Sequence, residues 1–143
     1  MSKPFSVVVW GDSIAAGNAQ VTWPALAERT ANLVNNLGTP VKVYNEGVGG
    51  MPAAKARSQF ADRVQAHQPD LVIIQFGFND LRHDGSRGHL PLSTQEEFAE
   101  HLTDMATRCV ALGAAVVIFG NHRTTLNLLQ MPNGYSYEAT RAQ

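Results

Sequence analysis

The residues best suited to chemistry stand in three glycine-containing turns. Ser13 lies in the first turn, Gly49 and Gly50 in the second, and Asn79 with Asp80 in the third. A serine hydroxyl is a poor nucleophile until the fold supplies a base for its proton and donors for the developing oxyanion. Backbone N–H groups and an asparagine amide are donors of this kind. If the three turns meet in space, the sequence predicts acyl-transfer chemistry at Ser13.

Each of these turns directly follows a short apolar run. The runs cover residues 5–10, 41–45 and 71–76, and a fourth run covers 114–119. They are short, rich in β-branched residues and followed by glycine or polar residues, which predicts buried strands. The run at 71–76 is nearly continuous in apolar residues, as expected for a strand that is covered on both faces.

Helices are predicted between the strands. The first follows a cap at Thr22 and runs to about Leu37 along an apolar stripe, and the second opens at Pro52. The third begins at a capping box over residues 93–96 and runs to about Leu112. Alternating strands and helices predict an α/β fold in which helices cover both faces of a parallel sheet. The three turns then share the carboxyl edge of that sheet, where such folds bind ligands.

Composition limits the classes of partner. The chain has 143 residues, 44% of them hydrophobic, which is enough for one domain with a sizeable core. A formal net charge of −1 offers no electrostatic basis for a nucleic-acid or membrane partner. The first residues lead straight into a strand with no signal peptide, so a cytoplasmic protein is expected. The single cysteine, Cys109, lies in a predicted amphipathic helix and is expected to be a buried, inert thiol.

The three turns resemble three of the four conserved blocks of the SGNH hydrolases, also called GDSL-type esterases. The matching motifs are Gly11-Asp12-Ser13, Gly49-Gly50 and Gly77-x-Asn79-Asp80, in the family's order and rough spacing. Each motif alone is weak, but three in order, each after a predicted strand, are specific. The resemblance extends over residues 5–143 and implies one domain with a flavodoxin-like, three-layer α/β/α sandwich. It also implies a serine esterase that works through a covalent acyl-serine.

The resemblance implies a role for each matching residue. Ser13 is the nucleophile, and the oxyanion is held by the backbone N–H groups of Ser13 and Gly50 and by the side-chain amide of Asn79. Gly50 is preferred to the nearby glycines because the family's usual offset is five residues after the position of Asn45. Asp12 and Asp80 are expected at the substrate site, where they brace their turns by hydrogen bonds to backbone N–H groups. Read from the residues alone, Ser13 is also a candidate helix cap, and the Asn79-Asp80 pair a simple turn.

The family's fourth block, Asp-x-x-His, does not occur in this sequence. That block carries the base and the aspartate that orients it. We therefore expect a chain that is incomplete at its C-terminus and lacks a helix, the last strand and the loop with the base. His122, directly after the fourth strand, is a candidate for lining the substrate site or for acting as base. The other four histidines are expected at the surface, with His83 and His89 in a solvated loop.

The expected partner is a small-molecule acyl ester, with acetylated carbohydrates as one substrate class. No metal is expected, because no histidine or cysteine pair has ligand spacing, and no cofactor is implied. The alternative function is a non-catalytic module that binds a carbohydrate or an ester, or an inactive fragment of the same fold. Without a fifth strand, the apolar edge at 116–119 is bare, which predicts self-association.

Overall fold

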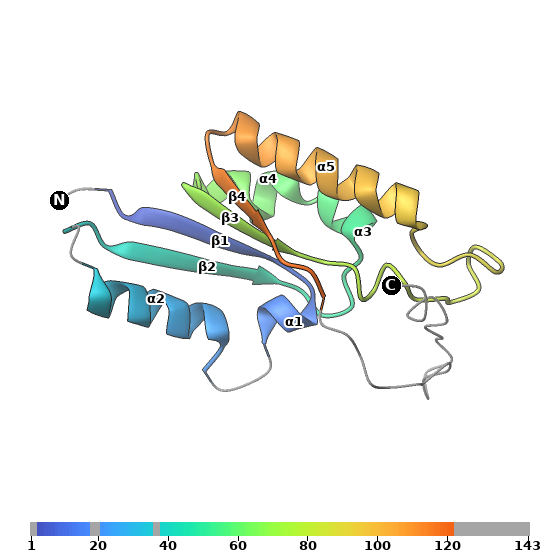
Figure 1. Cartoon of the computed structure of the whole chain (residues 1–143), viewed down its shortest axis with the longest axis horizontal. Helices are drawn as coiled ribbons and strands as arrows, with labels where there is room; N and C mark the ends of the chain where they lie inside the picture. Colours follow the sequence, from blue (N-terminus) through green and yellow to red (C-terminus); the bar gives the residue numbers. More distant parts are fainter. Residues whose placement is uncertain (1–2, 18–20, 36–37, 122–143) are drawn as a thin grey trace.

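The computed structural model describes residues 3–17, 21–35 and 38–121, and these form one open parallel sheet (Figure 1). The strand order is β2-β1-β3-β4, and every neighbouring pair is parallel. All four predicted strands are present, and the expected parallel α/β sheet is confirmed. Their bounds are β1 (Phe5–Gly11), β2 (Val41–Gly47), β3 (Leu71–Gln75) and β4 (Ala115–Ile118).

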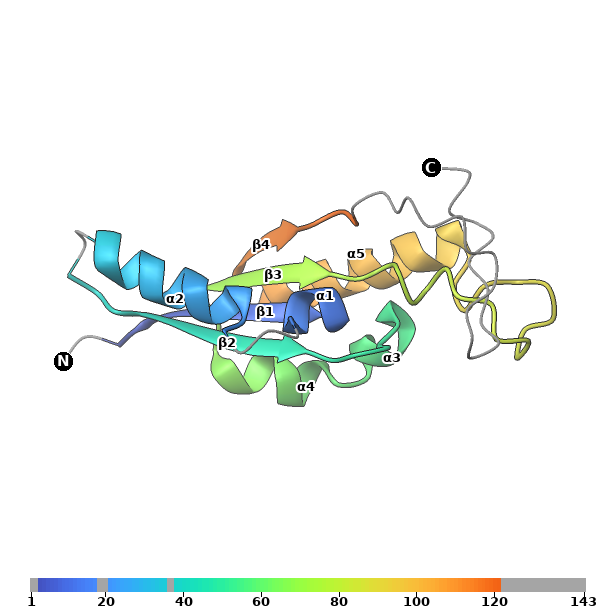
Figure 2. The ribbon, with the colours of Figure 1, turned by 90° about the horizontal axis from the view of Figure 1, so that it is seen from below.

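Helices lie on both faces of the sheet (Figures 1 and 2). One face carries the helices that follow β1, and the other carries those that follow β2 and β3. The first set is α1 (Ser13–Ala16) and α2 (Trp23–Val34). The second set is α3 (Ala53–Arg57), α4 (Phe60–Arg63), the short 3₁₀ helix η1 (Gln65–His67) and α5 (Gln95–Ala111).

The main core lies between the sheet and the α3–α5 layer. Because side chains alternate along a strand, Val8 and Trp10 of β1 point to this side, and Ile74 of β3 joins them there. Cys109 of α5 is buried in the same cluster, as expected, and burial raises the pKa of its thiol to about 11. The thiol therefore stays protonated and acts as a small apolar group.

The helix predicted to open at Pro52 is broken into three short pieces. The Ser58 hydroxyl donates to the Lys55 carbonyl at 2.7 Å, and Gln59 leaves the helical conformation with φ −102° and ψ 12°. A serine bonded to a nearby carbonyl competes with the regular helix ladder. The break keeps Phe60 turned into the core, where it is 8% exposed.

The apolar stripe expected to pack α2 against the sheet is largely exposed. Leu26 is 49% exposed, Leu33 79% and Val34 69%. The helix lies over β1 and β2, so that β4 lies to one side of it (Figure 2). The helix ends at Val34, because Asn35 after it has extended backbone (φ −76°, ψ 104°), so the predicted end at about Leu37 is too late. Leu37 itself lies outside the described residues.

The capping box of α5 begins one residue later than predicted. The Thr94 hydroxyl accepts from the Glu97 N–H at 3.3 Å, and the Thr94 N–H donates to the Glu97 carboxylate at 2.8 Å. Ser93 does not cap the helix, because its hydroxyl donates to Asp80 instead. Within the described residues, no helix has the length and apolar character needed to span a membrane.

Candidate active site

Ser13 lies at the carboxyl end of β1, the strand that pairs with both β2 and β3. It is the first residue of α1, and its side chain is exposed. Asp12 precedes it as the helix N-cap, with one carboxylate oxygen accepting from the Ile14 N–H at 2.9 Å. The helix cap is therefore Asp12, and the alternative role of Ser13 as the cap is wrong. The Ser13 hydroxyl stands at the edge of the sheet where parallel α/β folds bind ligands.

Two glycines allow α1 to lie tightly against the strand ends. A Cβ at Gly47 would lie 2.2 Å from the Ala16 backbone nitrogen, and a Cβ at Gly11 would lie 2.4 Å from the Ala15 Cβ. Both distances are far shorter than any real contact, so only glycine fits at these two positions. Sequence reasoning missed this role of Gly47, because nothing in the local pattern distinguishes it from Gly49.

The turn after β2 presents Gly50 to solvent. Gly50 has φ +71°, a left-handed conformation that favours glycine, and a Cβ there would meet nothing within 4 Å. The turn is closed by the Met51 N–H, which donates to the Val48 carbonyl at 3.3 Å. It is tied to the first turn by the Val48 N–H, which donates to the Gly11 carbonyl at 2.9 Å. The Gly50 turn therefore lies beside the end of β1.

The side-chain amide of Asn79 connects all three turns. Its Nδ2 donates to the second carboxylate oxygen of Asp12 at 3.3 Å and lies 3.5 Å from the Met51 carbonyl oxygen. Asp12 directly precedes Ser13, and Met51 directly follows Gly50. The buried Asn79 amide thus lies between Asp12, which adjoins Ser13, and Met51, which adjoins Gly50. The specific roles of Ser13, Gly50 and Asn79 in an oxyanion hole stay predictions.

Asp80 holds the second and third turns together. Its two carboxylate oxygens accept from the Ala53 N–H at 3.0 and 3.1 Å, and one also accepts from the Ser93 hydroxyl at 2.9 Å. Together with the Asp12–Ile14 bond, these contacts confirm that both aspartates brace turns through backbone N–H groups. Contact of either aspartate with a substrate stays a prediction. Ser93 was missed as a site residue because its position just before a helix predicted a cap.

Burial changes the acidity of both aspartates. It is the main cause of a raised pKa at Asp80, where the Ala53 N–H and the Ser93 hydroxyl act in the opposite direction. Burial is also the main cause of a raised pKa at Asp12, and the nearby charge of Asp80 adds to it. The hydrogen bonds from Ile14 and Asn79 lower the pKa of Asp12. The hydrogen-bond donors around the two carboxylates therefore offset part of the effect of burial on their pKa values.

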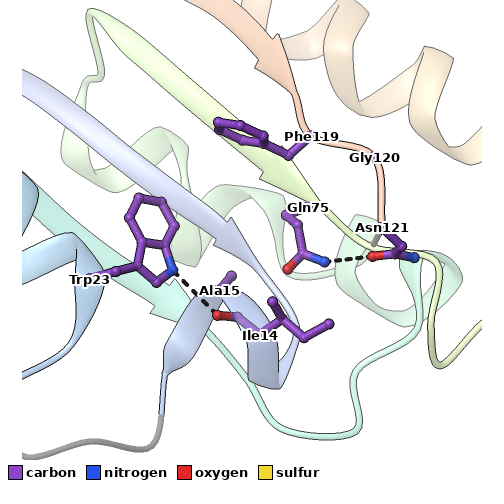
Figure 3. Close-up of a pocket in the computed structure, with 7 residues that line it drawn as sticks. All are labelled: Ile14, Ala15, Trp23, Gln75, Phe119, Gly120 and Asn121. Atoms are coloured by element: carbon purple, nitrogen blue, oxygen red, sulfur yellow. Dashed lines mark hydrogen bonds between the residues drawn. The ribbon is translucent and has the colours of Figure 1, made fainter. Parts of the chain in front are cut away.

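A cavity of about 300 Å³ opens on the α1 side of the strand ends (Figure 3). The Trp23 indole N–H donates to the Ile14 carbonyl at 3.3 Å on one side, and the Gln75 amide donates to the Asn121 side chain at 2.7 Å on the other. The lining is mostly apolar, and two of its residues belong to α1, the helix that begins with Ser13. It consists of Ile14, Ala15, Trp23, Gln75, Phe119, Gly120 and Asn121.

The structure describes four of the five histidines. His122 lies outside the described residues, so its role at the site stays a prediction. His67 bonds to Glu46 at 2.7 Å, and His101 bonds to Arg57 at 2.8 Å, on elements of the opposite layer. His83 is half-buried in its loop, with an Nε2 atom that is shielded from solvent, so it is less solvated than predicted.

No cluster of candidate metal ligands is found in the part of the chain that the structure describes. No group of three or more histidine, cysteine, aspartate or glutamate side chains among residues 3–17, 21–35 and 38–121 is arranged to hold a metal ion. The carboxylates of Asp12 and Asp80 instead accept from backbone N–H groups and from the Asn79 and Ser93 side chains. What this part of the chain offers is a serine hydroxyl beside buried, braced turns.

Comparison with known proteins places this geometry in a family. Residues 9–143 match the model of the GDSL-like lipase/acylhydrolase family. Esterase TesA of Pseudomonas aeruginosa is 29% identical over 133 residues, which cover 91% of this chain and 57% of that protein. An arylesterase of Vibrio mimicus is 29% identical over 115 residues, covering 78% of this chain and 52% of that protein. This chain thus spans about half the length of these curated relatives.

Solved structures share the fold. The crystal structure of a lipase/acylhydrolase from Enterococcus faecalis matches with a TM-score of 0.60 at 28% identity, over 79% of this chain and 55% of the other. The predicted resemblance to SGNH hydrolases is thus confirmed by sequence and by fold. Because the family model matches nearly the whole chain, this protein belongs to the GDSL-like lipase/acylhydrolase family.

Proposed function

We propose that this protein is a serine esterase that cleaves small acyl esters. The observation that carries the proposal is the position of the Asn79 amide, which bonds to Asp12 and lies against the Met51 carbonyl. This contact brings the turns of Ser13 and Gly50 to one buried donor. Convergence of a hydroxyl with preorganised donors is what acyl transfer requires of a site.

The proposed reaction proceeds in two steps. In the first, the Ser13 oxygen attacks the ester carbonyl carbon, and its proton passes to a general base and then to the departing alcohol. The negative oxygen of the tetrahedral intermediate is held by the N–H groups of Ser13 and Gly50 and by the Asn79 amide. In the second step, water attacks the acyl-serine and releases the acid. The structure assigns the base to no described residue.

The cavity beside α1 supports a small substrate. Its volume of about 300 Å³ lies at the lower end of ligand sites in proteins. The apolar side chains of Ile14, Trp23 and Phe119 favour a short alkyl or aromatic group on the ester. The proposal therefore includes acetyl and aryl esters, and acetylated carbohydrates within the acetyl class.

Hydrolysis of p-nitrophenyl acetate by the 143-residue chain tests the proposal, with Ser13→Ala as control. We expect the Ser13→Ala rate to fall to background. Asn79→Ala should lower kcat by about 10²–10³-fold, as loss of an oxyanion donor does elsewhere. Circular dichroism checks that each variant is folded. Equal rates in the folded parent and the folded Ser13→Ala variant would overturn the esterase proposal for this chain and favour a non-catalytic binding module or an inactive fragment of the same fold.

A further inference from the structure

Asp12 is fully buried, and its two carboxylate oxygens have different partners. Oδ1 accepts from the Ile14 N–H at 2.9 Å and caps α1. Oδ2 accepts from the Asn79 side-chain amide at 3.3 Å, across 67 residues of sequence. This second bond contributes nothing to the helix cap. The side chain is 0% exposed, so Asp12 acts on a bound ester only through the groups that it holds.

The Asn79 amide nitrogen carries two hydrogens, and each has an acceptor in this structure. One acceptor is the Asp12 carboxylate at 3.3 Å, and the other is the Met51 carbonyl oxygen at 3.5 Å. A charged acceptor holds a donor more strongly than a neutral carbonyl does, and 3.5 Å lies beyond the usual hydrogen-bond range. The hydrogen on Asp12 is therefore held firmly, and the hydrogen toward Met51 is the one that a better acceptor can take.

We propose that Asp12 is a positioning residue for the hydrolysis, because its carboxylate holds one hydrogen of the Asn79 amide and thereby aims the other at the oxyanion. In the free protein the second hydrogen lies against the Met51 carbonyl. The negative oxygen of the tetrahedral intermediate replaces this carbonyl as its acceptor. The role rests on the proposed esterase function and adds to the bracing of the first turn.

The residue type at position 12 supports this second role. Serine and asparagine cap helices about as well as aspartate does, and neither brings a buried charge. Burial is the main cause of the raised pKa of Asp12, so the carboxylate is a costly way to cap α1 alone. Only the carboxylate offers two oxygens that both accept, one for Ile14 and one for Asn79.

The charged neighbours of Asp12 come from one direction. Residues 13–17 of the first turn and 47–54 of the second contain no charged residue. Asp80 of the third turn faces Asp12 and adds to the effect of burial on its pKa. Burial raises the pKa of Asp80 as well, and His101 of α5 acts in the opposite direction. Any titration experiment on Asp12 therefore needs a separate reporter for Asp80.

Two substitutions separate capping from positioning. Asp12→Ser keeps one oxygen for the Ile14 N–H and offers Asn79 no second acceptor. Asp12→Asn keeps the shape of the side chain but replaces one oxygen by an NH₂ group. If its oxygen caps Ile14, its NH₂ group faces the Asn79 amide, which then turns over and presents oxygen instead of hydrogen to the oxyanion. We therefore expect Asp12→Asn to lose more activity than Asp12→Ser, whereas a role in shape alone gives the opposite order.

Hydrolysis of p-nitrophenyl acetate by the 143-residue chain tests this order. In Asp12→Asn, kcat should fall by about 10²–10³-fold, as it does when an oxyanion donor is lost, and in Asp12→Ser it should fall less. KM should stay within about twofold, because the oxyanion forms only in the transition state. The matched control is Asp70→Asn, since Asp70 accepts from the Ser6 N–H at 2.8 Å at the other end of β1. Its kcat should equal that of the parent. A kcat in Asp12→Asn equal to or above that of Asp12→Ser would overturn the proposal.

Nuclear magnetic resonance of the ¹⁵N-labelled chain tests the contact without hydrolysis. As the pH is lowered, the Asn79 side-chain amide and the Ile14 N–H should shift together, with a midpoint above the ordinary aspartate value of 3.8. The Ala53 N–H, which donates to Asp80, reports the other carboxylate. In Asp12→Ser the Asn79 shift should disappear while the Ala53 shift remains.

The two experiments fail in different ways. An Asn79 signal that titrates equally in the parent and in Asp12→Ser would overturn the positioning role, whatever the rates. Equal hydrolysis by the parent and by Ser13→Ala would overturn the esterase, and with it the catalytic consequence of the contact. In that case the Asn79 signal still decides whether Asp12 holds the amide.

Discussion

Asp80 binds two segments that are distant in sequence. Its carboxylate accepts from the Ala53 N–H, 27 residues earlier, and from the Ser93 hydroxyl, 13 residues later. The side chain is 1% exposed, so water cannot replace it as the acceptor. The positions of the Gly50 turn and of Asn79 therefore depend on this one carboxylate.

Replacing Asp80 should destabilise the fold, and the loss should be smaller when the new side chain keeps an acceptor oxygen. Asp80→Ala leaves the buried Ala53 N–H and the Ser93 hydroxyl without an acceptor, and it should lower the free energy of unfolding by about 2–4 kcal/mol. Asp80→Asn keeps one acceptor oxygen and should cost less. Urea unfolding followed by circular dichroism measures both. A loss in Asp80→Ala no larger than in Asp80→Asn would contradict this role.

The contribution of Glu97 to the free energy of unfolding should fall as the pH is lowered. Arg87 donates to both of its carboxylate oxygens, at 2.6 and 2.8 Å, and this pairing is the main cause that lowers the pKa of Glu97 to about 2. A lowered pKa stabilises the fold above the ordinary value of 4.5, and the benefit is lost as pH falls from there toward 2. Burial raises the pKa of Asp12 and Asp80, so their contributions change in the opposite sense.

Comparison with Glu97→Gln isolates this contribution, because the aspartates are the same in both proteins. The parent should be more stable than the variant near pH 7, and the difference should shrink between about pH 4.5 and 2. The measurement is the free energy of unfolding of both chains across this range. A difference that stays constant with pH would show that the ion pair is not its source.

At the scale of elements, α1 is placed by the strand ends beneath it. The helix has only four residues and makes few hydrogen bonds of its own, so its position depends on packing. Gly47, the last residue of β2, lies against the Ala16 backbone, and Gly11 ends β1 against Ala15. The exposure of Ser13 is thus a consequence of how closely two strands approach one short helix.

Substitution of Gly47 tests this packing against a nearby control. Gly47→Ala forces a Cβ into the Ala16 backbone, which cannot rotate away, and should cost about 1–3 kcal/mol and displace Ser13. Gly49→Ala places its Cβ in open space and should stay within about 0.5 kcal/mol of the parent. Thermal unfolding and p-nitrophenyl acetate hydrolysis measure both effects. Equal behaviour of the two variants would rule out the close approach.

At the scale of the whole molecule, the two edges of the sheet differ in chemistry. Side chains of α2 bond to the outer backbone of β2, whereas β4 has no such partners among the described residues. The same asymmetry appears in the layers, because α5 covers β4 on one face and α2 does not reach it on the other (Figure 2). In the part of the chain that the structure describes, the unpaired edge and the uncovered face therefore coincide at β4.

The strands and the order of the motifs were predictable from the sequence. Apolar runs that end at glycine or polar residues are local patterns, and β1 to β4 were found within two residues of their predicted ends. The parallel order places every carboxyl end at one edge, so the convergence of the three turns also followed from the sequence. The resemblance to SGNH hydrolases added the roles of Ser13, Gly50 and Asn79, which stay predictions.

What only the tertiary structure decided is which groups bond to one another across long sequence separations. Asn79 meets Asp12 from 67 residues away, and Ser93 gives up a helix cap to bond to Asp80. The need for glycine at position 47 and the exposure of Leu33 on α2 likewise depend on what lies opposite. Periodicity and turn chemistry are properties of neighbouring residues, so the sequence alone determines them. Contacts between distant segments depend on how the crossovers pack, and no local pattern encodes that packing.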